Sequence, residues 1–177
     1  IDHTPQRFLS SGLQSFEDVC NLTAELKSGR FPGVAPDVSI DIFGYSIGAS
    51  LTLLLLSADP QSLFKDTRAF LFCGGSVLNK SNPVFKTIMD NKAYHRLFDF
   101  LDSLTQNNIT ASDSLRYIKD SLSAQTYTDM NGTKWFKSLL FHNRMEKLRN
   151  FRLNQLHERI RAAVLTKDLV FAPQAVR

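Results

Sequence analysis

A serine stands at the centre of a G-x-S-x-G motif over residues 44–48. In this spacing the serine sits on a sharp turn between a strand and a helix, which lifts its hydroxyl clear of the sheet. We expect Ser46 to be a nucleophile and the N–H of Ile47, at the helix start, to face an oxyanion. We expect Gly44 and Gly48 to be glycines because a side chain at either position would collide with the neighbouring strand or helix.

The residues on both sides of this motif favour the strand and the helix that the turn requires. Residues 38–43 are rich in β-branched residues, and residues 49–56 are almost wholly apolar up to a stop at Pro60. Asp41 is a charged residue inside the expected strand, so it must be paired or lie near a strand end. The alternative is a serine in an ordinary turn of a parallel sheet.

The order of the elements around the motif predicts an α/β fold with a parallel sheet. A helix is expected over residues 15–27, with Ser15 as its N-terminal cap and Gly29 just past its end. A short apolar strand is expected over residues 69–73. Strands with so few polar residues are typical of a sheet that is covered on both faces.

The middle of the chain carries no strand pattern and reads as a helical insertion. Helices are expected from Asn82 to about residue 101, over 112–122 and over 133–160. A strand returns at 161–166 and is followed at once by Asp168. The chain therefore divides into a core segment (1–78), an insertion (79–160) and a return to the sheet (161–177). The insertion is interpreted as a lid over the site; the alternative is a crossover that only extends the core.

These segments together resemble the central and later part of the α/β-hydrolase family of serine esterases, lipases and peptidases, and they are also similar to an uncharacterised bacterial branch of that fold. The matching segments are residues 44–48, Phe72-Cys73-Gly74-Gly75 and residues 165–173. The resemblance implies that Ser46 is the nucleophile, that Asp168 is the acid of a catalytic triad and that the Ile47 N–H forms half of an oxyanion hole. An ordinary turn or capping role for Asp168 is the alternative.

The histidine that the resemblance requires does not follow Asp168. The family order is serine, acid, histidine, whereas His3, His95, His142 and His157 all precede Asp168. We therefore expect the sequence to be a fragment that is inactive alone, with the general base after its last residue. A base supplied from the insertion is the less favoured alternative.

The function expected from this resemblance is hydrolysis of an ester, thioester or amide through an acyl-enzyme, with an apolar small-molecule acyl substrate. The alternative is a non-catalytic domain of the same fold that binds a ligand or a partner. No cofactor or metal is expected, because no cluster of ligand residues has metal-site spacing. Cys20 and Cys73 lie in apolar settings and are predicted to be buried free thiols, which favours a cytoplasmic location.

Composition limits the remaining function classes. The chain has 177 residues, 43% of them hydrophobic, which is enough for one core, and no apolar run is long enough to span a membrane. The net charge of +4 is mild. Late basic residues are expected on the exposed face of a helix, and nucleic-acid binding is not expected because aromatic residues are not interleaved with them. These residues are Arg144, Lys147, Arg149, Arg152, Arg159 and Arg161. Oligomeric state is left open.

Overall fold

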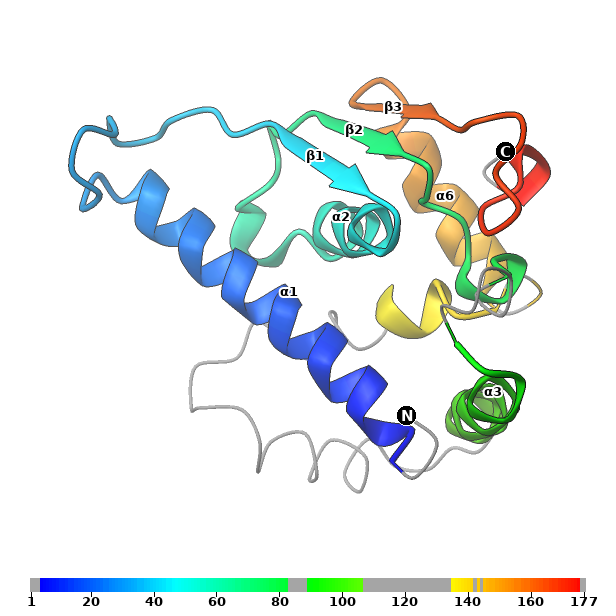
Figure 1. Cartoon of the computed structure of the whole chain (residues 1–177). Helices are drawn as coiled ribbons and strands as arrows, with labels where there is room; N and C mark the ends of the chain where they lie inside the picture. Colours follow the sequence, from blue (N-terminus) through cyan, green and yellow to red (C-terminus); the bar gives the residue numbers. More distant parts are fainter. Residues whose placement is uncertain (1–3, 83–88, 107–134, 142, 144, 176–177) are drawn as a thin grey trace.

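A small parallel sheet organises the molecule, as the sequence predicts. The computed structural model describes residues 4–82, 89–106, 135–141, 143 and 145–175. Three parallel strands lie in the order β1 (Ile42–Tyr45), β2 (Ala69–Phe72) and β3 (Ile160–Ala163) (Figure 1). Tyr45 pairs with Phe72, and Phe72 pairs with Ala163, so the three strands end level with one another. The α/β class is therefore confirmed.

Two helices pack on one face of this sheet and build the main core. Helix α2 (Ile47–Ala58) lies directly against the strands, and α1 (Gln6–Lys27) crosses beneath it (Figure 1). Because α2 is apolar on nearly every side, it can be buried between the sheet and α1. The buried cluster that joins them includes Phe16, Cys20, Leu53, Leu55, Leu56, Phe64 and Leu71.

The boundaries of the first helix and the first strand differ from the sequence prediction. α1 begins at Gln6, and Ser15 lies inside it with its Oγ donating to the Ser11 carbonyl at 3.0 Å, so Ser15 is not a cap. β1 begins only at Ile42, because Asp41 lies at the strand end and forms an ion pair with Arg68 at 2.7 Å. The predicted pairing of this carboxylate is confirmed. Gly29, with φ 71°, follows the end of α1 as expected.

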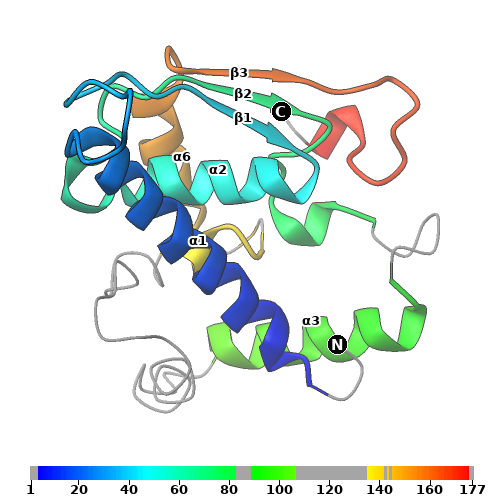
Figure 2. The same cartoon turned by 60° about the vertical axis from the view of Figure 1, so that its left-hand side comes forward.

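The second face of the sheet is open in the part of the chain that the structure describes. All the described helices lie on the other side (Figures 1 and 2). Phe43 and Phe70 stack with ring centroids 5.8 Å apart, and Tyr45 stacks on Phe72 at 5.9 Å. Phe43 and Tyr45 are 64% and 60% exposed. Cover on both faces was predicted from the apolar strands, and for these residues the prediction is wrong.

Parts of the predicted insertion belong to the core. The described elements there are α3 (Asn91–Gln106), a helical turn at 135–138 and α6 (Glu146–Leu156). Leu156 is fully buried in the main core, whereas α3 packs on α1 through a second cluster that includes Leu9, Leu13, Leu97 and Leu101. The helix expected from Asn82 begins at Asn91 in the described residues, and the helix expected over 112–122 lies outside them.

Three of the arginines between residues 144 and 161 bind backbone carbonyls and do not form a solvated face. The Arg149 side chain is buried, and it donates to the carbonyls of Ser138 at 2.8 Å and Phe141 at 3.3 Å. Arg152 donates to carbonyls at the C-terminal end of α2, and Arg159 to carbonyls in the loop before β2. The expectation of an exposed basic face is wrong for these residues because carbonyls at helix and strand ends need donors. Lys147 is exposed as expected.

Candidate active site

Ser46 has the backbone conformation of a residue held at a sharp strand-to-helix turn. Its φ and ψ are 54° and −122°, a region that non-glycine residues rarely adopt. Two hydrogen bonds hold it there: the Ser46 N–H donates to the Phe72 carbonyl at 3.0 Å, and the Ser46 carbonyl accepts from the Ala49 N–H at 3.0 Å. Strain of this kind persists where the surrounding structure fixes the backbone, and it is concentrated at functional sites.

Close packing around Ser46 explains the glycines at positions 44 and 74. It does not explain Gly48, for which a steric reason is also predicted from the sequence. A β-carbon on Gly44 would lie 2.6 Å from Thr52 Oγ1 and 2.8 Å from Ala49 Cα, so the steric prediction for Gly44 is confirmed. A β-carbon on Gly74, in the loop after β2, would overlap the Ser46 carbonyl. A β-carbon on Gly48 would meet no heavy atom of the described structure within 4 Å. The steric prediction for Gly48 is therefore wrong, because this residue faces open space.

The N–H of Ile47 is the first of helix α2. The first N–H groups of a helix have no acceptor within it, and the positive end of the helix dipole adds to their attraction for an anion. The residue is placed as an oxyanion donor requires, directly after Ser46. Ile47 is 56% exposed.

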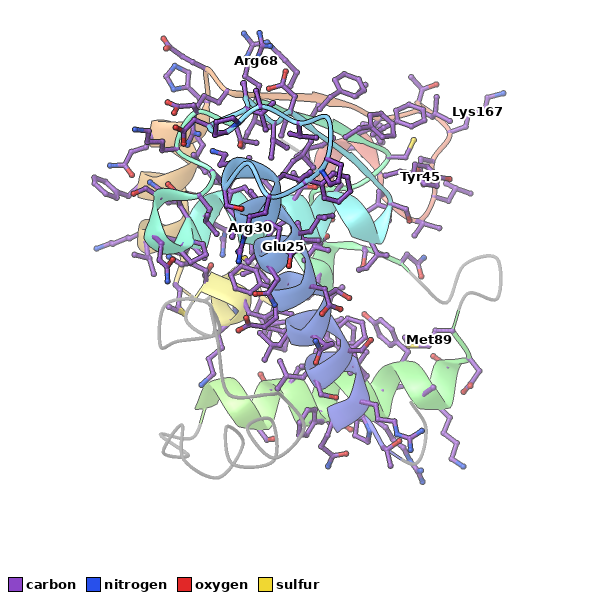
Figure 3. The ribbon with its side chains drawn as sticks, turned by 90° about the vertical axis from the view of Figure 1, so that its left-hand side faces the viewer. Glu25, Arg30, Tyr45, Arg68, Met89 and Lys167 are labelled. Atoms are coloured by element: carbon purple, nitrogen blue, oxygen red, sulfur yellow. The ribbon has the colours of Figure 1, made fainter. Side chains whose placement is uncertain are left out.

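Asp168 lies at the same end of the sheet as Ser46, in the loop after β3. Figure 3 shows Lys167 and Tyr45, the neighbours of these two residues, at one end of the sheet and Arg68 at the other. One carboxylate oxygen of Asp168 accepts from the N–H groups of Val170 and Phe171, both at 2.9 Å. This is the turn-forming role that was considered as the alternative, and it leaves the second oxygen for another donor.

The described histidines form no hydrogen bond with Ser46 or Asp168. His157 is exposed on the surface after α6, with Nδ1 2.6 Å from the Asn154 carbonyl, and His95 lies edge-on to Tyr94 in α3. Within the described ranges, no histidine ring forms a hydrogen bond with Ser46 or Asp168. His3 and His142 lie outside the described residues.

A cavity of about 730 Å³ is lined in part by the two residues that follow Ser46. Ile47 and Gly48 are among its lining residues, and the others come from α1, from later turns of α2, from Leu78 and from the segment around 136–140. Its wall is mainly apolar, with Leu51, Leu54 and Phe136 among the lining residues. The sequence signals the apolar face of α2 but not this cavity, because the lining residues come from segments that are far apart in the chain.

Both cysteines are buried free thiols, as predicted. Cys73 follows β2 with φ 48°, and its N–H donates to the Ala163 carbonyl at 2.9 Å, which extends the sheet by one residue. Among the residues placed by the structure, no three His, Cys, Asp or Glu side chains form a metal-binding group. None of the described helices combines the length and the apolar character needed to cross a bilayer.

Comparison with known proteins gives a family but no function. A family profile matches residues 1–177. The chain belongs to DUF6051, a family of unknown function. No curated protein and no solved structure matches it. The geometry around Ser46 is therefore the basis for a functional proposal for this family member.

Proposed function

We propose that the protein is a serine hydrolase of the α/β-hydrolase type, which cleaves an ester, thioester or amide through an acyl-enzyme. The observation that carries this proposal is the strained backbone of Ser46, φ 54° and ψ −122°, at a turn between a parallel strand and a buried helix. An ordinary serine in a strand-to-helix turn has no reason to hold this conformation, because other φ/ψ regions lack the strain.

In this mechanism the Ser46 hydroxyl attacks the carbonyl carbon of the substrate and forms a covalent ester. The developing oxyanion accepts from the Ile47 N–H at the start of α2. A histidine base takes the hydroxyl proton and returns it to the leaving group, and Asp168 orients that histidine with its second carboxylate oxygen. Water then hydrolyses the acyl-enzyme by the same steps.

We call the strand-to-helix turn at Ser46 the elbow. The cavity beside the elbow supports an acyl substrate with an apolar chain. Ile47 and Gly48, which follow the proposed nucleophile in sequence, are among its lining residues, and the lining is mainly carbon. The segment around residues 136–140 forms one wall. A lid function for the insertion is part of this proposal, with this segment as the portion nearest the site.

The test is covalent labelling of the natural full-length protein by a fluorophosphonate. We expect the label on Ser46, identified by peptide mass spectrometry, and its loss in Ser46→Ala. Ser62→Ala is a matched control, because Ser62 also has a positive φ, 59°, but lies in the loop after α2. Absence of any label, while a reference serine hydrolase reacts in the same tube, would contradict the proposal.

A non-catalytic domain of this fold is the second candidate. It is favoured by the turn role of Asp168 and by the absence of histidine contacts to Ser46 in the described residues. In that case the elbow would be retained for packing, and the cavity would bind a ligand without turnover. Ligand binding with no reaction of Ser46 would support it.

A further inference from the structure

The cavity beside Ser46 is lined by apolar side chains on two of its sides. Helix α2, the helical turn Leu78–Lys80 and the segment around 136–140 supply these residues, which are Ile47, Leu51, Leu54, Leu78, Phe136, Leu139 and Leu140. A β-carbon on Gly12 of α1 would lie 3.1 Å from Phe136 Cε2. The Phe136 ring therefore packs on α1 at Gly12, and both residues line the cavity.

The third wall is α1, where three of the polar side chains that line the cavity are bonded within the helix. Ser10 Oγ donates to the Arg7 carbonyl at 3.3 Å, and Ser15 Oγ donates to the Ser11 carbonyl at 3.0 Å. Gln14 Nε2 donates to Asp18 Oδ1 at 2.8 Å. Because these donors are committed, Arg7 and Ser11 are the other polar residues that the α1 wall presents to a ligand.

The length of this wall sets the length of a ligand that could lie along it. The α1 residues that line the cavity run from Arg7 to Ser15. Eight residues of helix span about 12 Å. An extended alkyl chain is a zigzag that advances about 1.25 Å per bond, so a chain of about eight to ten carbons, about 9 to 11 Å long, fits within this length. Arg7 is exposed and is the one charged side chain in the lining, so a longer chain would have to leave the apolar surface there.

Gly48 connects the cavity to the elbow. It lines the cavity two residues after Ser46, and a β-carbon there would meet no heavy atom of the described structure within 4 Å. Glycine is unfavourable inside a helix. The packing of α2 gives no reason for a glycine at this position, whereas a ligand that passes from Ser46 into the cavity would need the space.

We propose that this cavity is the acyl-chain site of the enzyme and that it selects unbranched chains of about eight to ten carbons. The inference rests on the proposed function, because it places the carbonyl of the substrate at Ser46. Gly48 is the specificity-determining residue in this arrangement. The apolar chain displaces water from carbon surface, and each buried methylene adds to the selectivity.

The first experiment compares p-nitrophenyl acetate, octanoate and palmitate as substrates of the full-length protein. We expect kcat/KM for the octanoate to exceed that for the acetate by about tenfold or more, and the palmitate to be slower than the octanoate. Gly48→Leu and Ser11→Trp fill the cavity from opposite walls. Each should lower kcat/KM for the octanoate by about tenfold and should lower the ratio of the octanoate value to the acetate value.

Glu25→Leu is the matched control, because Glu25 is exposed on α1 outside the cavity. This substitution should change kcat/KM for neither substrate. If wild type and both filled variants show the same dependence on chain length, the proposed acyl-chain site is wrong even though the hydrolase proposal holds.

A second experiment separates the cavity from the catalysis. Octan-1-ol is titrated into Ser46→Ala and followed by calorimetry, and saturable binding is expected that is lost when Gly48→Leu is added. Binding without any Ser46 labelling would overturn the proposed function but not the cavity. Labelling of Ser46 in the wild type without octanol binding in Ser46→Ala would overturn the acyl-chain site alone.

Discussion

Gly74 lies against the carbonyl of Ser46, so closely that a β-carbon there would overlap it. The contact joins the loop after β2 to the turn after β1, next to the hydrogen bond from the Ser46 N–H to the Phe72 carbonyl. The strained turn is therefore held by the neighbouring strand as well as by its own helix. Its integrity depends on residues that are absent from the G-x-S-x-G motif.

Alanine substitutions at three glycines should separate the positions where close packing requires a glycine from the position where a methyl group has room. Gly44→Ala and Gly74→Ala should each lower the free energy of unfolding by about 2 kcal/mol, because the new methyl group overlaps backbone or buried atoms. Gly48→Ala should raise it by up to about 1 kcal/mol, because alanine is the better helix former and has room. Urea unfolding measures all three. Equal losses at the three positions would show that the packing described here is wrong.

Asp168→Asn and Asp168→Ala distinguish the turn from the triad. Asparagine retains an oxygen that can accept from Val170 and Phe171, so Asp168→Asn should keep its stability within about 0.5 kcal/mol of wild type. Its rate of fluorophosphonate labelling should nevertheless fall by about a hundredfold or more, because the amide cannot stabilise an imidazolium. Asp168→Ala should lose both properties. An asparagine variant that reacts at the wild-type rate would leave Asp168 with a turn role only.

Cys20 should make the protein less stable in alkaline solution. Its side chain is fully buried, and burial, with the Glu17 and Asp59 carboxylates, holds the pKa of the thiol far above its usual value. Above the ordinary thiol pKa of about 8.5, the unfolded chain releases this proton and the folded chain keeps it. Stability should therefore fall as pH rises, by up to about 1.4 kcal/mol per pH unit from this group.

Urea unfolding between pH 8 and 10.5 measures this slope against Cys20→Val. The valine variant should show a flatter dependence, because it has no thiol to titrate in either state. Identical slopes in the two proteins would mean that Cys20 ionises in the folded state as readily as in the unfolded chain.

Arg149→Met should be among the most damaging changes in α6. The guanidinium is buried and donates to the carbonyls of Ser138 and Phe141, which would be left without this donor. We expect a loss of about 2 to 4 kcal/mol in the free energy of unfolding. Lys147→Met, an exposed position of the same helix, is the control and should change stability by less than about 0.5 kcal/mol. A similar small effect at Arg149 would show that these hydrogen bonds contribute little.

Local sequence was sufficient to predict the bounds of some helices and strands but not of others. α2 and β2 were predicted with nearly the observed bounds, because their apolar runs and the stop at Pro60 are local signals. β1 was predicted too early, because the pairing of Asp41 with Arg68 across the strand end is a tertiary contact. The buried role of Arg149 was missed for the same reason: its acceptors belong to another segment.

Some features of the candidate site were also predictable from local sequence, and others depend on tertiary contacts. Ser46 and Asp168 could be picked from motif and order, and the structure places them after β1 and β3, the two outer strands of the sheet, at the same end. The packing of Gly74 and the cavity depend on which residues meet in space, so the sequence pattern did not contain them. The glycine at 48 could have been questioned, since glycine inside a helix without a steric reason indicates a need for space.

The pairing of β2 with β3 also determines how the chain must fold. Ala69 pairs with Ile160 across roughly 90 residues, whereas Ile42 pairs with Ala69 across fewer than 30. Closing the longer loop costs more chain entropy, so we expect β1, α2 and β2 to assemble first and β3 to join late. Arg159, just before β3, donates to the carbonyls of Phe64 and Thr67, which would fasten the last strand once it arrives. The elbow would then form early, and the Asp168 loop would reach it only in the final step of folding.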